Sequence, residues 1–445
     1  MQPRGQVLVW QLPGGFAGED LHRLAHYRLR AMLASRLGSD NVEIRHETGA
    51  ADRVLARCTG DDPPRVLVLP AFRQHIWTTV ELIRKLAAAA PHVAVLASGW
   101  GTEPEYLEAI WRDAPPRHPR FAAVRGEVEA GLVDALVCLL ATDDWPVEAL
   151  VDAGLAVPDA GGGWRSRGRF REVADLAGLP SPLLEGDLRP AELDGMALVE
   201  VARGCLHRCR FCLSCNFARQ AVRSFPSARI RDEIAAAVRS GARSVGLLCS
   251  GLNYDVEQIE MVADAFESLD PERRLALEST IHTSFLDERR LRAIRRLPWR
   301  RMIIGLQSIN PSALALMKRS VDPARFRSAI ETISEFHVPV VEIILGLPGD
   351  TLEGFAETFR FALDLPAAIE VYRLRLDPGS EFMRDRDALG LVADFSREAR
   401  VVSTPTFSEK DLERAATALV RLRGRPWTFR ARHLAFDFDV IYDAR

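Results

Sequence analysis

The sequence predicts an α/β protein with two successive sheets, each covered by helices. Two stretches of the 445-residue chain alternate short apolar runs with longer segments of helical periodicity. Between these stretches, "PDAGGGWRSRGR" and "LAGLPSPLLEGDLRP" are rich in Gly, Pro and Arg, a composition that disfavours regular structure. We therefore expect a first domain over residues 1–154, a linker over 155–195, a second domain over 196–380 and a C-terminal helical and aromatic extension over 381–445.

The first domain is expected to be a doubly wound, Rossmann-like parallel sheet. Short runs of β-branched and apolar residues predict five strands, at residues 6–12, 41–46, 65–72, 92–99 and 121–126. Helical patterns such as residues 19–38 separate these runs, and the crossovers should be right-handed. Ligands on such sheets bind at the carboxyl ends of the strands. The glycines that follow the expected strands include Gly14, Gly15, Gly99, Gly101 and Gly126.

The second domain repeats the alternation and predicts a full or partial (β/α) TIM-like barrel. Its expected strands lie at residues 197–202, 244–250, 274–280, 301–308, 340–349 and 369–376. Helical segments such as residues 227–241 and 323–336 separate them, and active sites of this architecture lie at the carboxyl ends of the strands. After Pro378 and Gly379 the pattern thins to one amphipathic helix, over residues 408–424, and an aromatic tail.

Composition excludes several classes of protein. The formal net charge is −3, so no global basic field indicates nucleic acid, and the basic runs at 289–301 and 425–433 are interpreted as a solvated helix face and a tail. No run of about 18 uncharged apolar residues predicts a membrane span, and the N-terminus lacks a signal-peptide pattern. We therefore expect a cytoplasmic protein, in which the isolated Cys58, Cys138 and Cys249 are small buried hydrophobes.

Four of the seven cysteines lie close together, at Cys205, Cys209, Cys212 and Cys215. Structural zinc with four thiolates is one interpretation, although such sites usually combine two separate C-x2-4-C knuckles. A bacterial ferredoxin run has a different order, C-x2-C-x2-C-x3-C-P. The third interpretation is a [4Fe–4S] cluster held by three thiolates, with one iron left open. The C-x3-C-x2-C spacing supplies three ligands on one loop, directly after an expected barrel strand.

These residues resemble the radical S-adenosylmethionine (SAM) enzymes, whose signature is C-x3-C-x2-C with an aromatic residue before the last cysteine, here Phe211. Residues 301–319, 338–363 and 376–391 are similar to later strands, helices and loops of that family. The resemblance implies that Cys205, Cys209 and Cys212 bind a [4Fe–4S] cluster. It also implies that the amino and carboxyl groups of SAM chelate the open iron.

The same resemblance assigns further contacts with SAM. Ser250 and Gly251 lie where the family binds the methionine amino group, although Ser-Gly-Leu-Asn replaces Gly-Gly-Glu here. Gln307 and Ser308 correspond to a polar pair lining the site, and the backbone near Phe211 and Gly346 would hold the adenine and ribose. Three cysteines complete the cluster. Cys215 is therefore interpreted as a structural thiol beside the loop, with a hydrogen-donor role or contact with another cofactor as the alternative, and His207 as a solvated loop residue.

Residues 92–110 and 119–137 resemble the cobalamin-binding domain fused to many radical SAM enzymes. The matches are the glycine pair, Pro104-Glu105 and the Gly-Glu-x-Glu turn at 126–129. The cobalamin contacts implied are Gly14, Gly15, Gly99, Trp100, Gly101, Gly126 and Glu127. The Asp-x-His-x-x-Gly motif that ligates cobalt is missing, and the His-x-x-Gly of residues 46–49 is interpreted as coincidental. His75 and Trp77 are candidates to approach the lower corrin face.

The combined resemblance implies a methyltransferase that methylates an unactivated carbon of a small-molecule or natural-product substrate. A 5′-deoxyadenosyl radical would abstract the hydrogen atom, methylcobalamin would donate the methyl group, and an external donor such as flavodoxin or ferredoxin would supply electrons. One alternative is a radical enzyme catalysing cyclisation, rearrangement or oxidation, with cobalamin in another role or an empty first domain. The other is a non-catalytic scaffold stapled by zinc.

Overall fold

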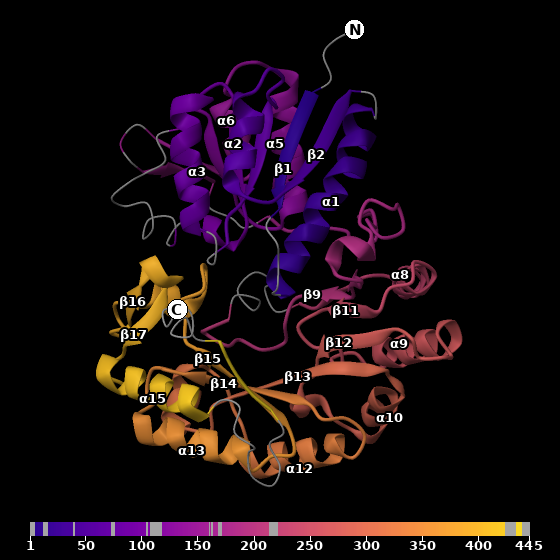
Figure 1. The fold of residues 1–445 in the computed structure, drawn as a ribbon, viewed down its shortest axis with the longest axis vertical. Coiled ribbons are helices and arrows are strands. Elements are labelled where there is room, and N and C mark those ends of the chain that lie inside the picture. The colour runs from indigo at the N-terminus through magenta and orange to yellow at the C-terminus, as the bar shows by residue number, and fades with distance from the viewer. Residues whose placement is uncertain are drawn as a thin grey trace. The chain divides into compact units, whose positions relative to one another are not determined.

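The structure is a computed structural model of the chain. It describes residues 5–11, 17–38, 41–72, 76–103, 106, 118–159, 161, 163–167, 171–212, 221–422 and 433–437. The chain divides into two compact units, residues 1–188 and 189–445. Each unit is an α/β layer structure with its own sheet (Figure 1).

The first unit is built on a seven-stranded sheet in the order β2-β1-β3-β4-β5-β6-β7. All five strands expected in this unit are present and pair in parallel. The strands are β1 (Gly5–Gln11), β2 (Val42–Thr48), β3 (Val66–Pro70), β4 (Ala94–Ser98), β5 (Phe121–Val124), β6 (Leu155–Pro158) and β7 (Trp164–Arg165). β3 and β4 are buried along their whole length, as expected for central strands covered on both faces.

Two strands of this sheet lie where the sequence predicts a linker. β6 pairs antiparallel with β5, and β7 antiparallel with β6, so part of the expected linker forms regular structure at the edge of the sheet. The physical reason is the short apolar run Leu155-Ala156-Val157, whose side chains are buried against the sheet edge. An antiparallel edge strand on an otherwise parallel sheet is common in doubly wound folds.

Helices cover both faces of the first sheet. They are α1 (Ala17–Leu37), α2 (Ala51–Thr59), α3 (Ile76–Ala89), α5 (Val128–Ala141) and α6 (Val147–Asp152), with a 3-10 turn at Trp100–Thr102. α1 packs against α5, and α2 packs against α3. The core between the sheet and the α1–α5 pair contains Val7 and Val9 of β1, Leu29 of α1 and Leu132 of α5. Leu8 and Trp10, which alternate with these valines and point to the other face, are also buried, so both faces of β1 are covered.

The second unit is built on a seven-stranded sheet in the order β18-β15-β14-β13-β12-β11-β8, in which every pairing is parallel. Its strands are β8 (Met196–Glu200), β11 (Ser244–Leu248), β12 (Ala276–Thr280), β13 (Trp299–Gln307), β14 (Val340–Leu345), β15 (Ala368–Arg373) and β18 (His433–Asp437). All six strands predicted from the sequence are present. Within the described residues no ladder joins β18 to β8, so this is the partial form of the expected barrel.

The seventh strand comes from the aromatic tail, which the sequence analysis placed in a C-terminal extension. β18 pairs with β15 from Ala368↔His433 to Tyr372↔Asp437, so the tail completes the barrel sheet. The sequence did not predict this strand, because "HLAFD" is a short run and its first residue, His433, pairs with Ala368, which lies 65 positions earlier. The expected amphipathic helix is present as α15 (Glu409–Leu422).

Helices follow the strands of the second unit. The helices are α8 (Ser227–Arg239), α9 (Val256–Leu269), α10 (Glu288–Arg296), α11 (Pro311–Leu316), α12 (Pro323–Ser334), α13 (Leu352–Leu363) and α14 (Glu381–Arg384), with 3-10 turns at Pro190–Leu193, Thr283–Phe285 and Phe395–Arg397. Two small antiparallel pairs, β9 (Ala202–Arg203) with β10 (Arg223–Ser224) and β16 (Val392–Asp394) with β17 (Arg400–Ser403), complete the unit. Side-chain N-caps begin α9 to α13 at Asp255, Asp287, Asn310, Asp322 and Thr351. Each cap fixes the residue at which the loop before the helix ends and the helix begins.

Candidate active site

The three predicted cluster cysteines lie on one loop that follows β8 and β9. The antiparallel pairing of Arg203 with Arg223 closes this loop at its base. Cys205 and Cys209 are buried, and Cys212 is half-buried beside the half-buried Phe211. Cys215 lies outside the described residues. Among the residues that the structure describes, no three His, Cys, Asp or Glu side chains are grouped to hold a single metal ion.

Two of these thiols have side-chain donors from distant parts of the sequence. The Tyr254 hydroxyl lies 3.2 Å from Cys205 Sγ, and the His207 backbone N–H donates to the same sulfur at 3.4 Å. Arg319, just beyond α11, directs Nη1 to Cys209 Sγ at 3.6 Å. Burial raises the pKa of the Cys209 thiol, and the Arg319 guanidinium opposes that rise. Soft thiolates that accept hydrogen bonds form a donor set that fits an iron–sulfur cluster.

Arg210 fastens the cysteine loop to two helices of the second unit. Its guanidinium pairs with Glu381 of α14 at 3.1 Å and with Asp385, just beyond α14, at 2.6 Å. It also lies over the Phe382 ring. Its backbone N–H donates to the Met317 carbonyl at the end of α11, and its carbonyl accepts from Phe382 N. These contacts hold the loop from both sides, so the spacing of the cysteines does not depend on the loop alone.

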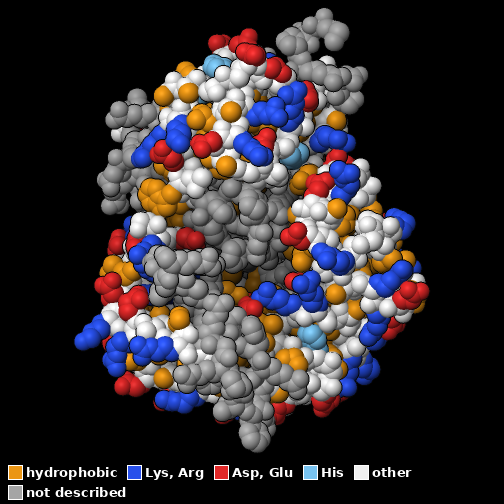
Figure 2. Space-filling model, viewed as in Figure 1, with side chains coloured by type: hydrophobic (Ala, Val, Ile, Leu, Met, Phe, Trp, Pro, Cys, Tyr) orange, Lys and Arg blue, Asp and Glu red, His pale blue; other side chains and the backbone are white. Residues whose placement is uncertain are grey.

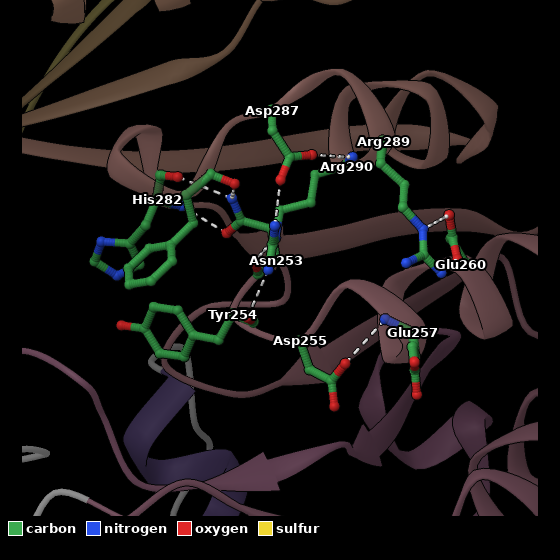
Figure 3. A network of polar contacts seen from close by, with 10 residues as sticks. Asn253, Tyr254, Asp255, Glu257, Glu260, His282, Asp287, Arg289 and Arg290 are labelled. Atoms are coloured by element: carbon green, nitrogen blue, oxygen red, sulfur yellow. Dashed lines mark hydrogen bonds and ion pairs between the residues drawn. The ribbon is translucent and has the colours of Figure 1, made fainter.

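The loop after β11 carries Ser250 and Gly251 to the carboxyl edge of the sheet, next to the cysteine loop. Figure 3 shows how Asn253 ties this loop to the one after β12: its amide donates to the His282 carbonyl at 2.8 Å and accepts from His282 N at 2.9 Å. Arg290 of α10 donates to the Asn253 carbonyl. A Cβ on Gly251 would lie 2.7 Å from the Tyr254 ring and 2.8 Å from His282. Only glycine therefore lets these two rings pack against the loop.

Four rings form a stack over the loop of Cys205: His207, Tyr254, His282 and Phe285. The His207 and His282 centroids are 4.5 Å apart, Tyr254 stacks on His282 at 5.1 Å, and Phe285 meets Tyr254 edge-on at 5.0 Å. Burial lowers the pKa of His282 to about 3 and also lowers that of His207, so both imidazoles are neutral at pH 7. The expectation that His207 is a solvated loop residue was wrong, because its half-buried ring stacks on His282.

The predicted polar pair Gln307 and Ser308 ends β13. Gln307 has φ +70° beside a shift in the β13–β14 register, and strained backbone of this kind clusters at functional sites. Ser308 is fully buried. Its hydroxyl accepts from Asn310 N at 3.0 Å and lies 3.4 Å from the Thr358 hydroxyl of α13. This geometry gives Ser308 a role in holding the turn, and its contact with SAM stays a prediction.

The remaining predicted SAM residue, Gly346, follows β14 with φ +91°. A Cβ there would lie 3.0 Å from Leu412 of α15. The left-handed backbone and this close approach both favour glycine. Cys249, expected to be a buried hydrophobe, lies at the end of β11 with its sulfur 3.7 Å from the Ser279 hydroxyl, and burial raises its pKa to about 11.

Charged residues that the sequence analysis did not single out lie together on the face of β13, β14 and β15. Arg301 pairs with Glu370 at 2.6 Å, and the Tyr372 hydroxyl donates to the same carboxylate at 2.6 Å. Glu342 stands between Gly305 and Glu370 in register. Burial raises the pKa of Glu342 to about 7, the charge of Glu370 adds to the rise, and Arg301 opposes it. The carboxyl of Glu342 therefore carries a proton in part of the molecules at neutral pH.

This raised pKa predicts a pH-dependent stability. A carboxyl whose pKa is higher in the folded than in the unfolded chain keeps its proton longer when folded, so stability falls as pH rises from about 4.5 to about 7. Glu342→Gln removes the charged form. We expect the cluster-free variant to gain about 1–3 kcal/mol over wild type at pH 8 and to lose that advantage near pH 4.5. Thermal unfolding at both pH values measures the difference.

Glu272→Gln is the control for that measurement, because the Glu272 side chain is 73% exposed. It should shift stability equally, by a few tenths of a kcal/mol, at both pH values. An equal effect of Glu342→Gln at pH 4.5 and pH 8 would contradict the raised pKa.

In the first unit, the predicted glycines that the structure describes, Gly99, Gly101 and Gly126, follow the carboxyl ends of β4 and β5. Gly99 has φ +139°, and a Cβ on Gly99 or Gly101 would lie 2.6 or 2.7 Å from the Ala71 carbonyl oxygen, after β3. A Cβ on Gly126, φ +94°, would lie 2.5 Å from the Arg171 backbone. These glycines therefore allow neighbouring loops to pack closely, and their contact with cobalamin stays a prediction. The Glu127 carboxylate accepts from Val173 N at 2.6 Å.

Other predicted residues of the first unit fall partly outside the described structure. Gly14, Gly15, His75, Pro104 and Glu105 are outside it, and for Trp100 only the backbone is described, in the 3-10 turn.

His46 and Trp77 have no assigned role in the site. His46 stacks on Tyr27 at 4.4 Å and contacts Gln11, and Trp77 is an exposed residue of α3.

The sequence analysis missed two buried polar pairs of the first unit. His26 of α1 lies 2.8 Å from the Ser98 hydroxyl at the end of β4. Arg28 of α1 pairs with Glu129 of α5 at 2.8 Å, and both side chains are almost fully buried. Arg28 also donates to the Pro180 carbonyl. Residue 129 belongs to the Gly-Glu-x-Glu turn, so its second glutamate joins two helices of the core.

Residues 199–362 match the model of the Radical SAM superfamily. A radical SAM domain implies a [4Fe–4S] cluster and SAM as cofactors, and the cysteine loop described above lies within the matched region. The sequence relatives include two tRNA-2-methylthio-N(6)-dimethylallyladenosine synthases. The enzyme of Chlorobium limicola is 28% identical over 36% of this chain and 36% of its own length. That of Acinetobacter baylyi is 26% identical over 44% and 41%. The matches thus span less than half of these relatives.

Solved structures share the fold over more of the chain. The radical SAM methyltransferase TsrM from Kitasatospora setae, solved with cobalamin and a [4Fe–4S] cluster, has a TM-score of 0.65 at 16% identity. The match covers 88% of this chain and 76% of TsrM. OxsB, a cobalamin-dependent SAM radical enzyme, has a TM-score of 0.62 at 12% identity, over 94% and 61%. The two-unit fold of this chain is therefore shared with TsrM and OxsB.

Proposed function

We propose that the protein is a cobalamin-dependent radical SAM methyltransferase that methylates an unactivated carbon of a small-molecule or natural-product substrate. The observation that carries the proposal is the pairing, in one chain, of the cysteine loop with a first unit whose fold is shared with TsrM and OxsB. In the proposal, Cys205, Cys209 and Cys212 hold the cluster. The first unit holds cobalamin along the carboxyl edge of its sheet, near Gly99, Gly101 and Gly126.

When bound, the cluster supplies one electron that cleaves the sulfonium of SAM to methionine and a 5′-deoxyadenosyl radical, and cobalamin supplies the methyl group. The chain's own residues bind and orient these partners. Ser250 and Gly251 follow β11 and Gln307 ends β13, at the same carboxyl edge of the sheet, where they can contact SAM beside the cysteine loop. Arg210 holds that loop in place, and Arg319 places a positive charge at Cys209. A one-electron donor of the flavodoxin or ferredoxin class completes the system.

A small substrate is favoured over a nucleic acid by the distribution of charge. Three arginines of α10 pair with carboxylates of α9 or of the C-cap of α12: Arg289 with Glu260, Arg296 with Glu267 and Arg295 with Glu335. Figure 2 shows that basic and acidic side chains are interspersed over the described surface of the face in view. Nucleic-acid sites instead expose clustered, uncompensated Lys and Arg. Within the described residues, no helix is both long and apolar enough to cross a membrane.

The test is transfer of label from methyl-labelled SAM. The protein is reconstituted anaerobically with iron, sulfide and hydroxocobalamin, reduced, and incubated with SAM. We expect bound corrin, label in the corrin fraction with release of S-adenosylhomocysteine, and formation of 5′-deoxyadenosine. Formation of 5′-deoxyadenosine without bound corrin would instead support a radical enzyme with an empty first unit. Absence of both would overturn the proposal.

A parallel incubation with unmodified tRNA tests the activity named for the curated relatives. We expect no label in the tRNA fraction. Transfer of label to tRNA would overturn the small-molecule assignment, while leaving the cluster and SAM assignments in place.

A further inference from the structure

The phenol of Tyr254 contacts a predicted cluster ligand. Its hydroxyl lies 3.2 Å from Cys205 Sγ, although the two residues are 49 positions apart in sequence. When Cys205 is a thiolate bound to iron it has no proton to donate, so only the phenol can act as donor. The His207 N–H, at 3.4 Å, is a second donor to the same sulfur.

The ring of Tyr254 is held in this position by its neighbours. His282 stacks on one face at 5.1 Å, and Phe285 meets it edge-on at 5.0 Å. Gly251 leaves room for the Tyr254 ring, because a Cβ there would lie 2.7 Å from it. The His282 ring is itself fixed by a 3.0 Å contact between Nε2 and the Ser250 carbonyl. The hydroxyl therefore has little freedom to turn away from the sulfur.

Hydrogen bonds to cluster sulfurs change the reduction potential of the cluster. A donor withdraws electron density from the thiolate and so stabilises the reduced, more electron-rich cluster relative to the oxidised one. Reduction adds one electron, from the external donor, to the [4Fe–4S] cluster, so the charge of its iron–sulfide core goes from 2+ to 1+, and no bond to Tyr254 forms or breaks. The same contact would exert no such effect on a site that holds no cluster, so this inference rests on the proposed function.

We propose that Tyr254 is a positioning and tuning residue that donates a hydrogen bond to the Cys205 thiolate and thereby raises the reduction potential of the cluster. Electron transfer from the cluster to SAM is favoured by a low reduction potential of the cluster. Reduction of the cluster by an external donor is favoured by a higher potential. Through its hydrogen bond to Cys205, Tyr254 adjusts the reduction potential of the cluster between the requirements of these two steps.

The experiment compares wild type with Tyr254→Phe in the full, reconstituted chain, by electron paramagnetic resonance during a titration with dithionite. Phenylalanine keeps the ring and its stacking but removes the hydroxyl. We expect unchanged iron and sulfide content and an equilibrium for reduction about 3- to 10-fold less favourable, which is a shift of up to about 59 mV to more negative potential for one electron. An unchanged potential, or loss of the cluster from a folded variant, would overturn the inference.

Tyr372→Phe is the matched control, because the Tyr372 hydroxyl donates to Glu370 rather than to sulfur. Its potential should equal that of wild type, and an equal shift in both variants would overturn the inference.

If Tyr254→Phe fails to fold, replacement of the five tyrosines by 3-fluorotyrosine provides a second measurement. This more acidic phenol is a stronger donor, so the potential should rise, and an unchanged or lower value would contradict the inference. Absence of any cluster from the wild type would instead defeat the proposed function.

Discussion

Replacement of Cys209 by serine should abolish assembly of the cluster. The Cys209 thiol is buried on the loop between Cys205 and Cys212, and it faces Arg319. A serine hydroxyl at this position is a harder and far less acidic ligand than a thiol, so it cannot replace the thiolate that iron–sulfur clusters require. We expect iron and sulfide to fall from about four of each per chain to background, and 5′-deoxyadenosine formation to fall by at least about 100-fold. Chemical iron and sulfide assays measure the first effect.

Cys215→Ala is the control, since it removes a thiol from the same segment of sequence. If three cysteines bind the cluster and one iron stays open for SAM, this variant keeps its iron and sulfide. Loss of the cluster in Cys215→Ala, or its retention in Cys209→Ser, would contradict the division of the four cysteines into three ligands and one other thiol.

The second large effect is expected from Arg28→Met, in the core of the first unit. Arg28 and Glu129 have side-chain exposures of 1% and 2% and join α1 to α5. Removing one partner leaves a buried, uncompensated carboxylate, which costs about 3–5 kcal/mol of stability. We expect the unfolding transition of the first unit to move to lower temperature by more than 10 °C, with loss of bound corrin. Circular dichroism on heating measures the shift.

A matched pair on the same two helices provides the control for this prediction. Arg36 pairs with Asp134 at 3.4 Å, but its side chain is 54% exposed, so Arg36→Met should cost less than about 1 kcal/mol. Combining Arg28→Met with Glu129→Leu should recover most of the lost stability, because no charge is then left buried. Equal destabilisation by Arg28→Met and Arg36→Met would contradict the role assigned to the buried pair.

Eleven of the fourteen strands of the two main sheets could be predicted from the sequence because each is a short apolar run bounded by turn residues. The three that were missed, β6, β7 and β18, lie in segments rich in Gly, Pro or Arg, where composition predicts irregular structure. Their pairing is decided by the sheet edge they reach, at β5 or β15. Local sequence does not contain that information, so edge strands added late in a unit are the least predictable part of this fold.

In the candidate site too, features set by local sequence could be predicted, and features set by distant residues could not. The cysteine loop, Gly251 and Gln307 could be predicted because their motifs are local in sequence. The donors Tyr254 and Arg319 could not, since they lie 49 and 110 positions from the thiols that they contact. Glu342 was missed because only burial among strands gives its carboxyl an unusual pKa. For Ser308 and Glu127, the structure adds partners that lie 50 and 46 positions away, Thr358 and Val173, which local motifs could not reveal.

The central claim is that three cysteines of this chain hold a [4Fe–4S] cluster with one iron open to SAM. Electron paramagnetic resonance of the reconstituted and reduced full chain, recorded with and without SAM, tests it most directly. We expect the signal of a reduced [4Fe–4S] cluster whose g-values shift when SAM is added, and no such signal in Cys209→Ser. Absence of the signal from wild type, or a signal that SAM leaves unchanged, would contradict it.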